Sequence, residues 1–232
     1  MEAIILAGGL GTRLRSVVQE EPKCMAPVCN RPFLYYLLCY LEKYHVDHVV
    51  LALGYKHEVV LKWLQGQNFN MEISWVVEDE PLGTGGAILK ACGSIREKQV
   101  LVMNGDTVFN IDLFSFYQMA EQENKPILLA LKPMKNFDRY GNVEVMEGNR
   151  VVSFQEKRYC KKGHINGGVY VLIPESGLFE GCGKKFSFET DILQCNVHKD
   201  IIGGFISDGY FIDIGIPEDY ERANRELCKY LK

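Results

Sequence analysis

Residues 3–14 read AIILAGGLGTRL, a short apolar run that passes directly into a glycine-rich segment. The apolar part, from Ala3 to Ala7, has the length and composition of a buried strand. The glycines that follow leave backbone amides uncovered, so a loop of this kind can wrap closely around phosphate oxygens. Arg13 adds a side chain that can bind a phosphate through two parallel hydrogen bonds. A strand followed by such a loop predicts an α/β fold that binds a nucleotide.

The glycine-rich segment matches neither of two common phosphate-binding patterns. It lacks the Gly-Lys-Ser/Thr ending of a Walker loop. Arg13 and Leu14 stand where the third glycine of a dinucleotide fingerprint would fall. These departures argue against an NAD-dependent oxidoreductase.

Short apolar runs alternate with longer helical patterns over the first 132 residues. Strands are expected at 49–53, 72–77, 100–103 and 127–131, and helices at 32–44, 57–64, 85–92 and 113–123. Continuous apolar strands separated by helices are typical of parallel β-α-β units, with helices covering both faces of the sheet.

The pattern changes after residue 132. Segments 142–146 and 151–155 flank a turn that contains glycine and asparagine, which predicts a β-hairpin. Further strands are expected at 169–173, 201–206 and 211–214, with helices at 187–195 and from Pro217 to Leu231. No internal repeat or linker divides the chain. We therefore expect one Rossmann-like α/β domain over residues 1–232, with a mainly parallel central sheet and antiparallel additions in its C-terminal half.

Composition narrows the classes of protein that the chain can belong to. With 47% hydrophobic and 11% aromatic residues, it has ample material for a core and is not disordered. Its 26 basic and 30 acidic residues give a net charge of −4. That balance argues against a protein that binds duplex nucleic acid, which needs a basic stripe. It does not exclude small anionic ligands, because a phosphate pocket needs only local cations and backbone amides.

The sequence carries no targeting or membrane signal. The N-terminus lacks the basic start and long apolar segment of a signal peptide, and no run approaches the roughly 18 apolar residues of a membrane span. The eight cysteines contain no C-x-x-C pair and so show neither zinc nor redox spacing. We expect a soluble, cytoplasmic protein without a membrane partner, whose thiols are reduced and mostly buried.

With the segment 22–28, PKCMAPV, the glycine-rich loop resembles the signature of the sugar-1-phosphate nucleotidylyltransferase family. Segments similar to that family recur in order along the chain, at 81–87 (PLGTGGA), 104–106 (NGD), 154–157 (FQEK), 166–168 (NGG) and 213–220 (DIGIPEDY). Segments 137–141 (FDRYG) and 186–189 (FSFE) carry a narrower resemblance, to bacterial guanylyltransferases of D-glycero-D-manno-heptose 1-phosphate. The resemblance implies a GT-A-like nucleotidyltransferase fold, with a nucleotide-binding half at 1–132 and a sugar-phosphate-binding half at 133–232.

The reaction implied by this resemblance joins two small-molecule substrates, a nucleoside triphosphate and a sugar 1-phosphate. The sugar phosphate attacks the α-phosphorus, and pyrophosphate leaves. Because two polyanions must meet, positioning and charge neutralisation should supply most of the catalysis. By resemblance, the catalytic residues are Arg13, Lys23, Asp106 and Asp213. The implied nucleotide-binding residues are Leu6, Ala7, Gly8, Gly9, Gly11, Thr12, Arg13, Lys23, Glu78, Gly83, Thr84 and Asp106.

Two aspartates are candidates for a metal site. Asp106 follows an apolar run and so lies at the carboxyl end of a parallel strand, where ligands bind in open α/β sheets. Asp213 ends another apolar segment, just before the last predicted helix. Paired carboxylates can hold a Mg²⁺ ion that bridges phosphate oxygens. The resemblance implies that Asp106 and Asp213 are the Mg²⁺ ligands, although each alone would also suit a turn or a helix cap.

The implied sugar-phosphate site raises a geometric problem. Glu156 and Lys157 are neighbours in a predicted strand, so their side chains should point to opposite faces. The resemblance implies that Glu156 binds sugar hydroxyls and Lys157 the phosphate, which predicts an irregular backbone at this pair. Gly141, Asn166 and Glu189 are further candidates for the sugar-phosphate site by their positions in the motifs.

The identity of the base depends on one residue. Glu78 precedes the 81–87 segment, where relatives that use thymine or uracil often have a glutamine. A carboxylate only accepts hydrogen bonds, which suits the N1–H and N2–H₂ groups of guanine. This favours GTP as the substrate and a GDP-heptose, used for surface polysaccharide, as the product. Glu80 is a competing candidate for the contact with the base.

Two other functions remain open at this point. One is a uridylyl- or thymidylyltransferase acting on a hexose or amino-sugar 1-phosphate. The other is a regulatory domain that binds a nucleotide sugar without turnover. Such a domain could lose its catalytic lysine or an aspartate, and this chain keeps Arg13, Lys23, Asp106 and Asp213. A homodimer is common for the fold.

Overall fold

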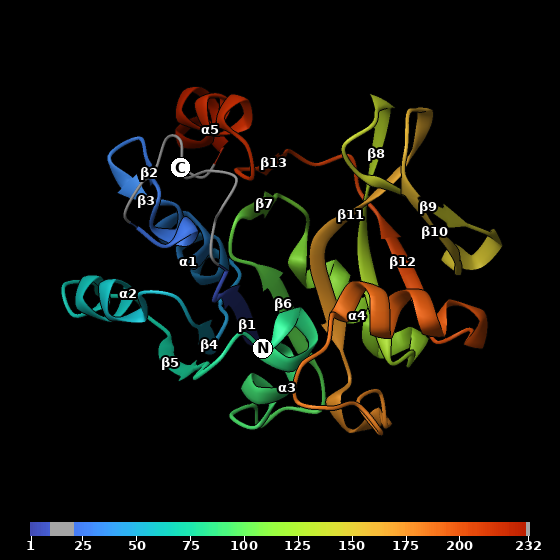
Figure 1. Ribbon diagram of the computed structural model, residues 1–232, viewed down its shortest axis with the longest axis horizontal. Helices are drawn as coiled ribbons and strands as arrows, with labels where there is room; N and C mark the ends of the chain where they lie inside the picture. Colours follow the sequence, from blue (N-terminus) through green and yellow to red (C-terminus); the bar gives the residue numbers. More distant parts are fainter. Residues whose placement is uncertain (10–20, 231–232) are drawn as a thin grey trace.

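Among the residues that the structure describes, nine strands form one central sheet (Figure 1). This computed structural model describes residues 1–9 and 21–230, except for the side chains of residues 228 and 230. Strand β1 (Glu2–Ala7) pairs in parallel with β4 (His48–Leu53) and with β6 (Val100–Asn104), and β4 pairs in parallel with β5 (Glu72–Val77). The predicted parallel units are confirmed, and the carboxyl ends of all four strands lie at one edge of the sheet.

Helices cover both faces of the parallel strands, as the apolar patterns predict (Figure 1). Helix α1 (Phe33–Lys43) packs in one hydrophobic cluster with Ile5 and Leu51, and α3 (Gly83–Cys92) packs in the other with Ile4 and Val50. Successive residues of a strand point to opposite faces, so the two helices lie on opposite sides. The remaining helices are α2 (His57–Leu64), α4 (Leu113–Glu123) and α5 (Pro217–Tyr230). None of the described helices is long and apolar enough to cross a membrane.

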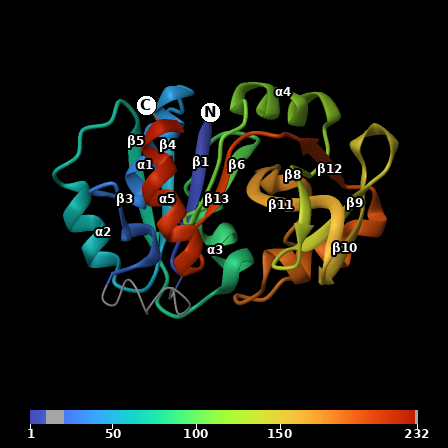
Figure 2. The same ribbon diagram turned by 90° about the horizontal axis from the view of Figure 1, so that it is seen from above.

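The C-terminal half adds antiparallel strands to this sheet (Figure 2). Strand β11 (Cys160–Leu172) runs antiparallel between β6 and β8 (Ile127–Phe137), and β12 (Ile202–Ile206) pairs in parallel with β8. The fifth apolar run, β8, therefore does not continue the parallel strands directly, because β11 is inserted beside β6. An apolar run indicates burial but not the direction or neighbour of a strand.

The predicted hairpin is confirmed as β9 (Gly141–Val145) and β10 (Val151–Lys157), which pair antiparallel. Its turn contains a short helical segment, Glu147–Asn149, in which Gly148 has a φ of 71°. A left-handed backbone of this kind is the reason for a glycine in the turn. The predicted helix at 187–195 is a π-helix over Phe188–Gln194, a form that is rare and frequent at functional sites.

Several short strands and helices complete the fold. Strand β7 (Thr107–Phe109) pairs antiparallel with β13 (Phe211–Asp213), and β2 (Pro27–Val28) pairs with β3 (Arg31–Pro32). Three-residue 3₁₀ helices occur at Lys23–Met25, Pro174–Ser176 and Val197–Lys199. The pairing of β7 with β13 places Asp213 opposite Thr107, the residue after Asp106.

The cysteines follow the prediction only in part. Cys24, Cys39, Cys92, Cys160, Cys182 and Cys195 have free thiols, and only Cys24 of these is fully buried. Cys29 is disulfide-bonded, so the prediction of reduced thiols is wrong at this position. Sequence spacing does not show which thiols meet in three dimensions, and this is why the sequence did not predict the disulfide bond.

A buried polar network anchors the amino end of the parallel strands. Glu2, only 3% exposed, is joined by hydrogen bonds to the His48 ring at 2.7 Å and to the amides of Arg96 at 2.6 Å and Glu97 at 2.8 Å. The second ring nitrogen of His48 lies 2.7 Å from Ser74 Oγ. Burial alone would raise the pKa of Glu2, but these hydrogen bonds outweigh it and lower the pKa to about 2.

Replacing Glu2 with glutamine should therefore destabilise the fold in a pH-dependent way. The ionised carboxylate stabilises the fold above its ordinary pKa of 4.5, and this contribution is lost as the pH falls towards about 2. The shift corresponds to about 3 kcal/mol. Urea unfolding at pH 7 should show a loss of that size for Glu2→Gln, and a smaller loss at pH 3. The matched control is Glu58→Gln, whose side chain is 67% exposed. A pH-independent difference would contradict this role of Glu2.

Candidate functional site

A cleft of about 660 Å³ opens at the carboxyl ends of β1, β4, β5 and β6. We call it the main cleft. The sequence-predicted residues that line it are Leu6, Ala7, Gly8, Gly9, Lys23, Glu78, Gly83, Thr84 and Asp106. Gly11, Thr12 and Arg13 lie outside the described residues. The cleft therefore brings together every described residue of the predicted nucleotide site, from four strand ends, the 3₁₀ helix that begins at Lys23 and the start of α3.

Close packing in the main cleft explains two of its glycines. A Cβ atom on Gly8 would lie 2.5 Å from Oε1 of Glu78, so a larger residue there would displace this carboxylate from the end of β1. Oε2 of Glu78 accepts a hydrogen bond from the Leu82 amide at 2.8 Å. Gly83 has a φ of 74°, and a Cβ there would lie 2.5 Å from the Phe186 carbonyl oxygen. The backbone before α3 thus both orients Glu78 and packs against the C-terminal half.

Lys23 joins the two predicted metal ligands. It begins the 3₁₀ helix Lys23–Met25, and its ammonium forms an ion pair with Oδ2 of Asp106 and lies 3.7 Å from Oδ1 of Asp213. Thr107 Oγ1 donates to Asp106 Oδ1 at 3.0 Å, and the Gly215 amide donates to Asp213 Oδ1 at 2.7 Å. The two carboxylates are therefore oriented by their own chain segments and share one cation.

The electrostatics of this cluster favour a bound cation. Burial raises the pKa of Asp213, and the negative charge of Asp106 raises it further. Lys23, the Gly215 amide and Arg139 act in the opposite direction. A second cation between the carboxylates would relieve the same repulsion.

The two carboxylates suit a Mg²⁺ ion that is bound together with substrate phosphates, rather than a metal ion that is held by protein side chains alone. In proteins Mg²⁺ is usually bound by one or two carboxylates together with substrate phosphates. Asp106 and Asp213 provide two carboxylates at the edge of a cleft lined by glycines. Among residues 1–9 and 21–230, no group of three or more His, Cys, Asp and Glu side chains could hold a metal ion. The residues present therefore fit a Mg²⁺ ion that arrives with a polyphosphate.

Two of the predicted sugar-phosphate residues lie beside the main cleft. Glu189 Oε2 accepts a hydrogen bond from Thr84 Oγ1 at 2.5 Å, and Thr84 Oγ1 accepts one from the Phe188 amide at 2.9 Å. Asn166 donates to the Tyr170 hydroxyl at 2.8 Å, and the Tyr170 ring packs edge-on against Phe188 at 5.1 Å. The first turn of α3 is thus connected to both residues through the π-helix.

The other predicted sugar-phosphate residues lie on the β9–β10 hairpin and do not line the main cleft. Gly141 pairs with Lys157 across the hairpin, and the register shifts between Phe154 and Lys157. The predicted irregular backbone is therefore confirmed. Glu156 and Lys157 are both exposed. Tyr140, the residue before Gly141, donates a hydrogen bond to Asp213 at 3.4 Å and so connects the start of this hairpin to one of the two predicted metal ligands.

Several residues of the main cleft were not among the predicted ones. They are Cys24, Gly54, Tyr55, Asp79, Pro81, Ala87, Asn104 and Gly105, together with the competing candidate Glu80. Gly54 and Tyr55 follow directly after β4, so the rule that sites lie at strand carboxyl ends could have found them. Tyr140 lies in the 137–141 segment that carries the narrower resemblance, but nothing in that segment predicts its contact with Asp213, which depends on how β8 and β13 are placed.

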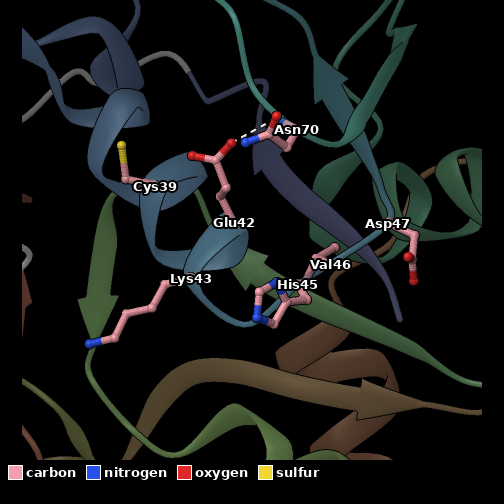
Figure 3. Close-up of a pocket in the computed structure, with 7 residues that line it drawn as sticks. All are labelled: Cys39, Glu42, Lys43, His45, Val46, Asp47 and Asn70. Carbon is pink, nitrogen blue, oxygen red and sulfur yellow. Dashed lines mark hydrogen bonds between the residues drawn. The ribbon is translucent and has the colours of Figure 1, made fainter.

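A second hollow, of about 550 Å³, lies at the opposite end of the parallel strands (Figure 3). It is lined by Cys39, Glu42, Lys43, His45, Val46, Asp47 and Asn70. Figure 3 shows the side chains of Lys43 and Asp47 pointing in different directions, and the backbone N–H of Asn70 donates to Oε1 of Glu42 at 2.6 Å. The residues that line this hollow include no glycine and do not form a phosphate-binding loop. The main cleft is therefore the candidate active site.

Comparison with known proteins agrees with this geometry. A family model described as nucleotidyl transferase matches residues 2–230. The D-glycero-alpha-D-manno-heptose 1-phosphate guanylyltransferase of Aneurinibacillus thermoaerophilus is 48% identical over 231 residues, covering 100% of both chains. The enzyme of the same name from Campylobacter jejuni is 46% identical and covers 95% of this chain and 97% of its own.

Solved structures give the same result. HddC from Yersinia pseudotuberculosis, in a crystal structure complexed with GMP-PN, is 36% identical with a TM-score of 0.86. That alignment covers 97% of this chain and 99% of the HddC chain. The Rossmann-like α/β fold with its mostly parallel sheet is thus shared along almost the whole length. This chain belongs to the nucleotidyl transferase family.

Proposed function

We propose that the protein transfers a guanylyl group from GTP to D-glycero-D-manno-heptose 1-phosphate, which gives a GDP-sugar and pyrophosphate. The observation that carries this proposal is the Lys23 ammonium shared by Asp106 and Asp213 at the edge of a glycine-lined cleft. The full-length similarity to two enzymes named for this heptose phosphate supports the choice of both substrates.

In this proposal the glycine loop binds the triphosphate. Gly8 and Gly9 line the main cleft, and Gly11, Thr12 and Arg13 follow them in the glycine-rich sequence. Lys23 neutralises charge at the α-phosphate. An oxygen of the sugar phosphate forms a bond to the α-phosphorus while the bond to the bridging oxygen of the β-phosphate breaks. Pyrophosphate takes that electron pair, so positive charge around both phosphates lowers the barrier.

Asp106 and Asp213 would hold Mg²⁺. When bound, this ion supplies positive charge that neutralises the phosphate oxygens. Both carboxylates already contact a cation in the form of Lys23. Loss of either aspartate should therefore disturb the neutralisation of charge more than the binding of the base.

The sugar 1-phosphate would enter from the C-terminal half. Glu189 and Asn166 lie beside the main cleft and offer hydrogen-bonding groups to sugar hydroxyls. Gly141, Glu156 and Lys157 lie together on the β9–β10 hairpin, where Lys157 can take the phosphate.

Glu78 is the residue that we assign to the base. Its Oε2 accepts from the Leu82 amide, and its Oε1 lies against Gly8. A carboxylate in this position can accept hydrogen bonds from the N1–H and N2–H₂ groups of guanine, which uracil and thymine cannot offer in that pattern.

We further propose a cytoplasmic enzyme of surface-polysaccharide synthesis that forms a homodimer.

Substrate preference tests the proposal. ATP, CTP, GTP, UTP and dTTP should each be tested with heptose, mannose, glucose and N-acetylglucosamine 1-phosphates, following pyrophosphate release. We expect GTP with the heptose phosphate to give a kcat/KM at least tenfold above every other pair. Preference for UTP or dTTP would contradict the assignment of Glu78. Tight nucleotide binding without turnover of any pair would instead indicate a regulatory domain.

The metal assignment has its own test. Asp106→Asn and Asp213→Asn should each reduce Mg²⁺-dependent pyrophosphate release by at least about 100-fold, because each removes charge from the proposed Mg²⁺ site. Asp208→Asn is the matched control, since that side chain is 87% exposed and pairs with Lys132. Normal turnover of both site variants with Mg²⁺ would show that these carboxylates do not hold the metal.

A further inference from the structure

Tyr140 connects the loop between β8 and β9 to one of the two site carboxylates. Its hydroxyl donates to Oδ2 of Asp213 at 3.4 Å. Its ring packs edge-on against Phe211, which lies in the same short strand as Asp213, at 5.9 Å. Phe211 in turn packs edge-on against Phe109 at 5.7 Å, so the phenol rests on the β7–β13 pair. Tyr140 therefore contacts the strand that carries Asp213 through both its ring and its hydroxyl.

Arg139 fixes the ring of Tyr140 from the solvent side. Its guanidinium lies 5.4 Å from the Tyr140 ring centroid, and its Nη1 pairs with Oδ2 of Asp219 at 2.5 Å. Asp219 lies in the first turn of α5, is only 14% exposed and also pairs with Arg222 at 3.3 Å. The guanidinium thus combines an ion pair to a carboxylate of low exposure with a cation–π contact to the Tyr140 ring. The loop is thus anchored to α5 as well as to β13.

This loop also leads directly to the proposed sugar-phosphate residues. Gly141, the next residue, begins β9 and pairs with Lys157 across the hairpin. A displacement of Tyr140 would therefore move both the hairpin and the environment of Asp213. Among the described residues, no other side-chain hydroxyl donates a hydrogen bond to the Asp213 carboxylate, and the other hydrogen bond to this carboxylate comes from the Gly215 amide.

We propose that Tyr140 is a positioning residue that orients the Asp213 carboxylate, and that the Arg139–Asp219 ion pair holds Tyr140 in place. This inference rests on the proposed function, in which Asp213 holds Mg²⁺. The distance of 3.4 Å is long for an O–H···O hydrogen bond. Such bonds at active sites often tighten only when substrate is bound. Groups that orient a metal ligand typically change metal affinity by about 10- to 100-fold when they are removed.

Tyr140→Phe tests this role because it removes the hydroxyl and keeps the ring. We expect the Kd for Mn²⁺, measured by electron paramagnetic resonance on the free enzyme, to rise about tenfold. The Mg²⁺ concentration for half-maximal pyrophosphate release should rise by a similar factor. The KM for GTP at saturating Mg²⁺ and the midpoint of thermal unfolding should stay close to those of the wild type. A merely structural tyrosine would change the unfolding midpoint instead.

Tyr159→Phe is the matched control. That tyrosine also precedes a strand of the same half, is 67% exposed and donates to Asn136 at 3.0 Å. It should leave Mn²⁺ affinity, Mg²⁺ dependence and turnover unchanged.

Arg139→Gln tests the second part of the proposal. It should weaken Mn²⁺ binding several-fold, and the double variant with Tyr140→Phe should bind Mn²⁺ no more weakly than Tyr140→Phe alone. Such non-additivity is expected if Arg139 acts through Tyr140. Additive losses would overturn the link between the two residues.

Wild-type Mn²⁺ affinity and Mg²⁺ dependence in Tyr140→Phe would overturn the positioning role. If Asp213→Asn then loses Mn²⁺ binding and turnover, the proposed function stands and only the role of Tyr140 is wrong. If Asp213→Asn binds Mn²⁺ like the wild type, the metal assignment itself is wrong, and Tyr140 has no metal ligand to orient.

Discussion

The ammonium of Lys23, shared between Asp106 and Asp213, is the interaction on which the arrangement of the site depends. It joins three segments that are far apart in the sequence, namely the Lys23–Met25 turn, the end of β6 and the end of β13. Lys23 is only 12% exposed and Asp213 only 20%. Charges with so little water around them need partners, so the ammonium of Lys23 and the two carboxylates stabilise one another.

The sheet explains why these residues can meet. Parallel strands bring their carboxyl ends to one edge, which places Gly8, Glu78 and Asp106 around one cleft. Asp213 comes from the other end of the chain and joins them through the antiparallel pairing of β13 with β7. The amide of Ile214 also donates to the Asp106 carbonyl at 3.0 Å. The two carboxylates are therefore held in register by backbone hydrogen bonds, independently of any ligand.

The parallel half was predictable from the sequence, because buried parallel strands such as β4 are continuous apolar runs bounded by helical patterns. The insertion of β11 beside β6 was not, since apolarity carries no information on strand direction. Motif resemblance predicted about half of the residues that line the main cleft, whereas the contact of Tyr140 with Asp213 arises only in the folded chain. Likewise, the scattered cysteines gave no sign that Cys29 is disulfide-bonded. The predicted roles of Gly11, Thr12 and Arg13 remain predictions, because those residues lie outside the described part of the chain.

The central claim is that Lys23 serves as the counter-ion of Asp106 and Asp213 until a divalent cation joins them. Mn²⁺ binding to Lys23→Met, measured by electron paramagnetic resonance without nucleotide, tests this claim most directly. Removal of the ammonium leaves two neighbouring carboxylates without their shared cation, so Mn²⁺ should bind more tightly than to the wild type. Turnover should nevertheless fall by at least about 100-fold, because the α-phosphate loses its lysine. Unchanged or weaker Mn²⁺ binding would contradict the claim that lysine and metal share these two carboxylates.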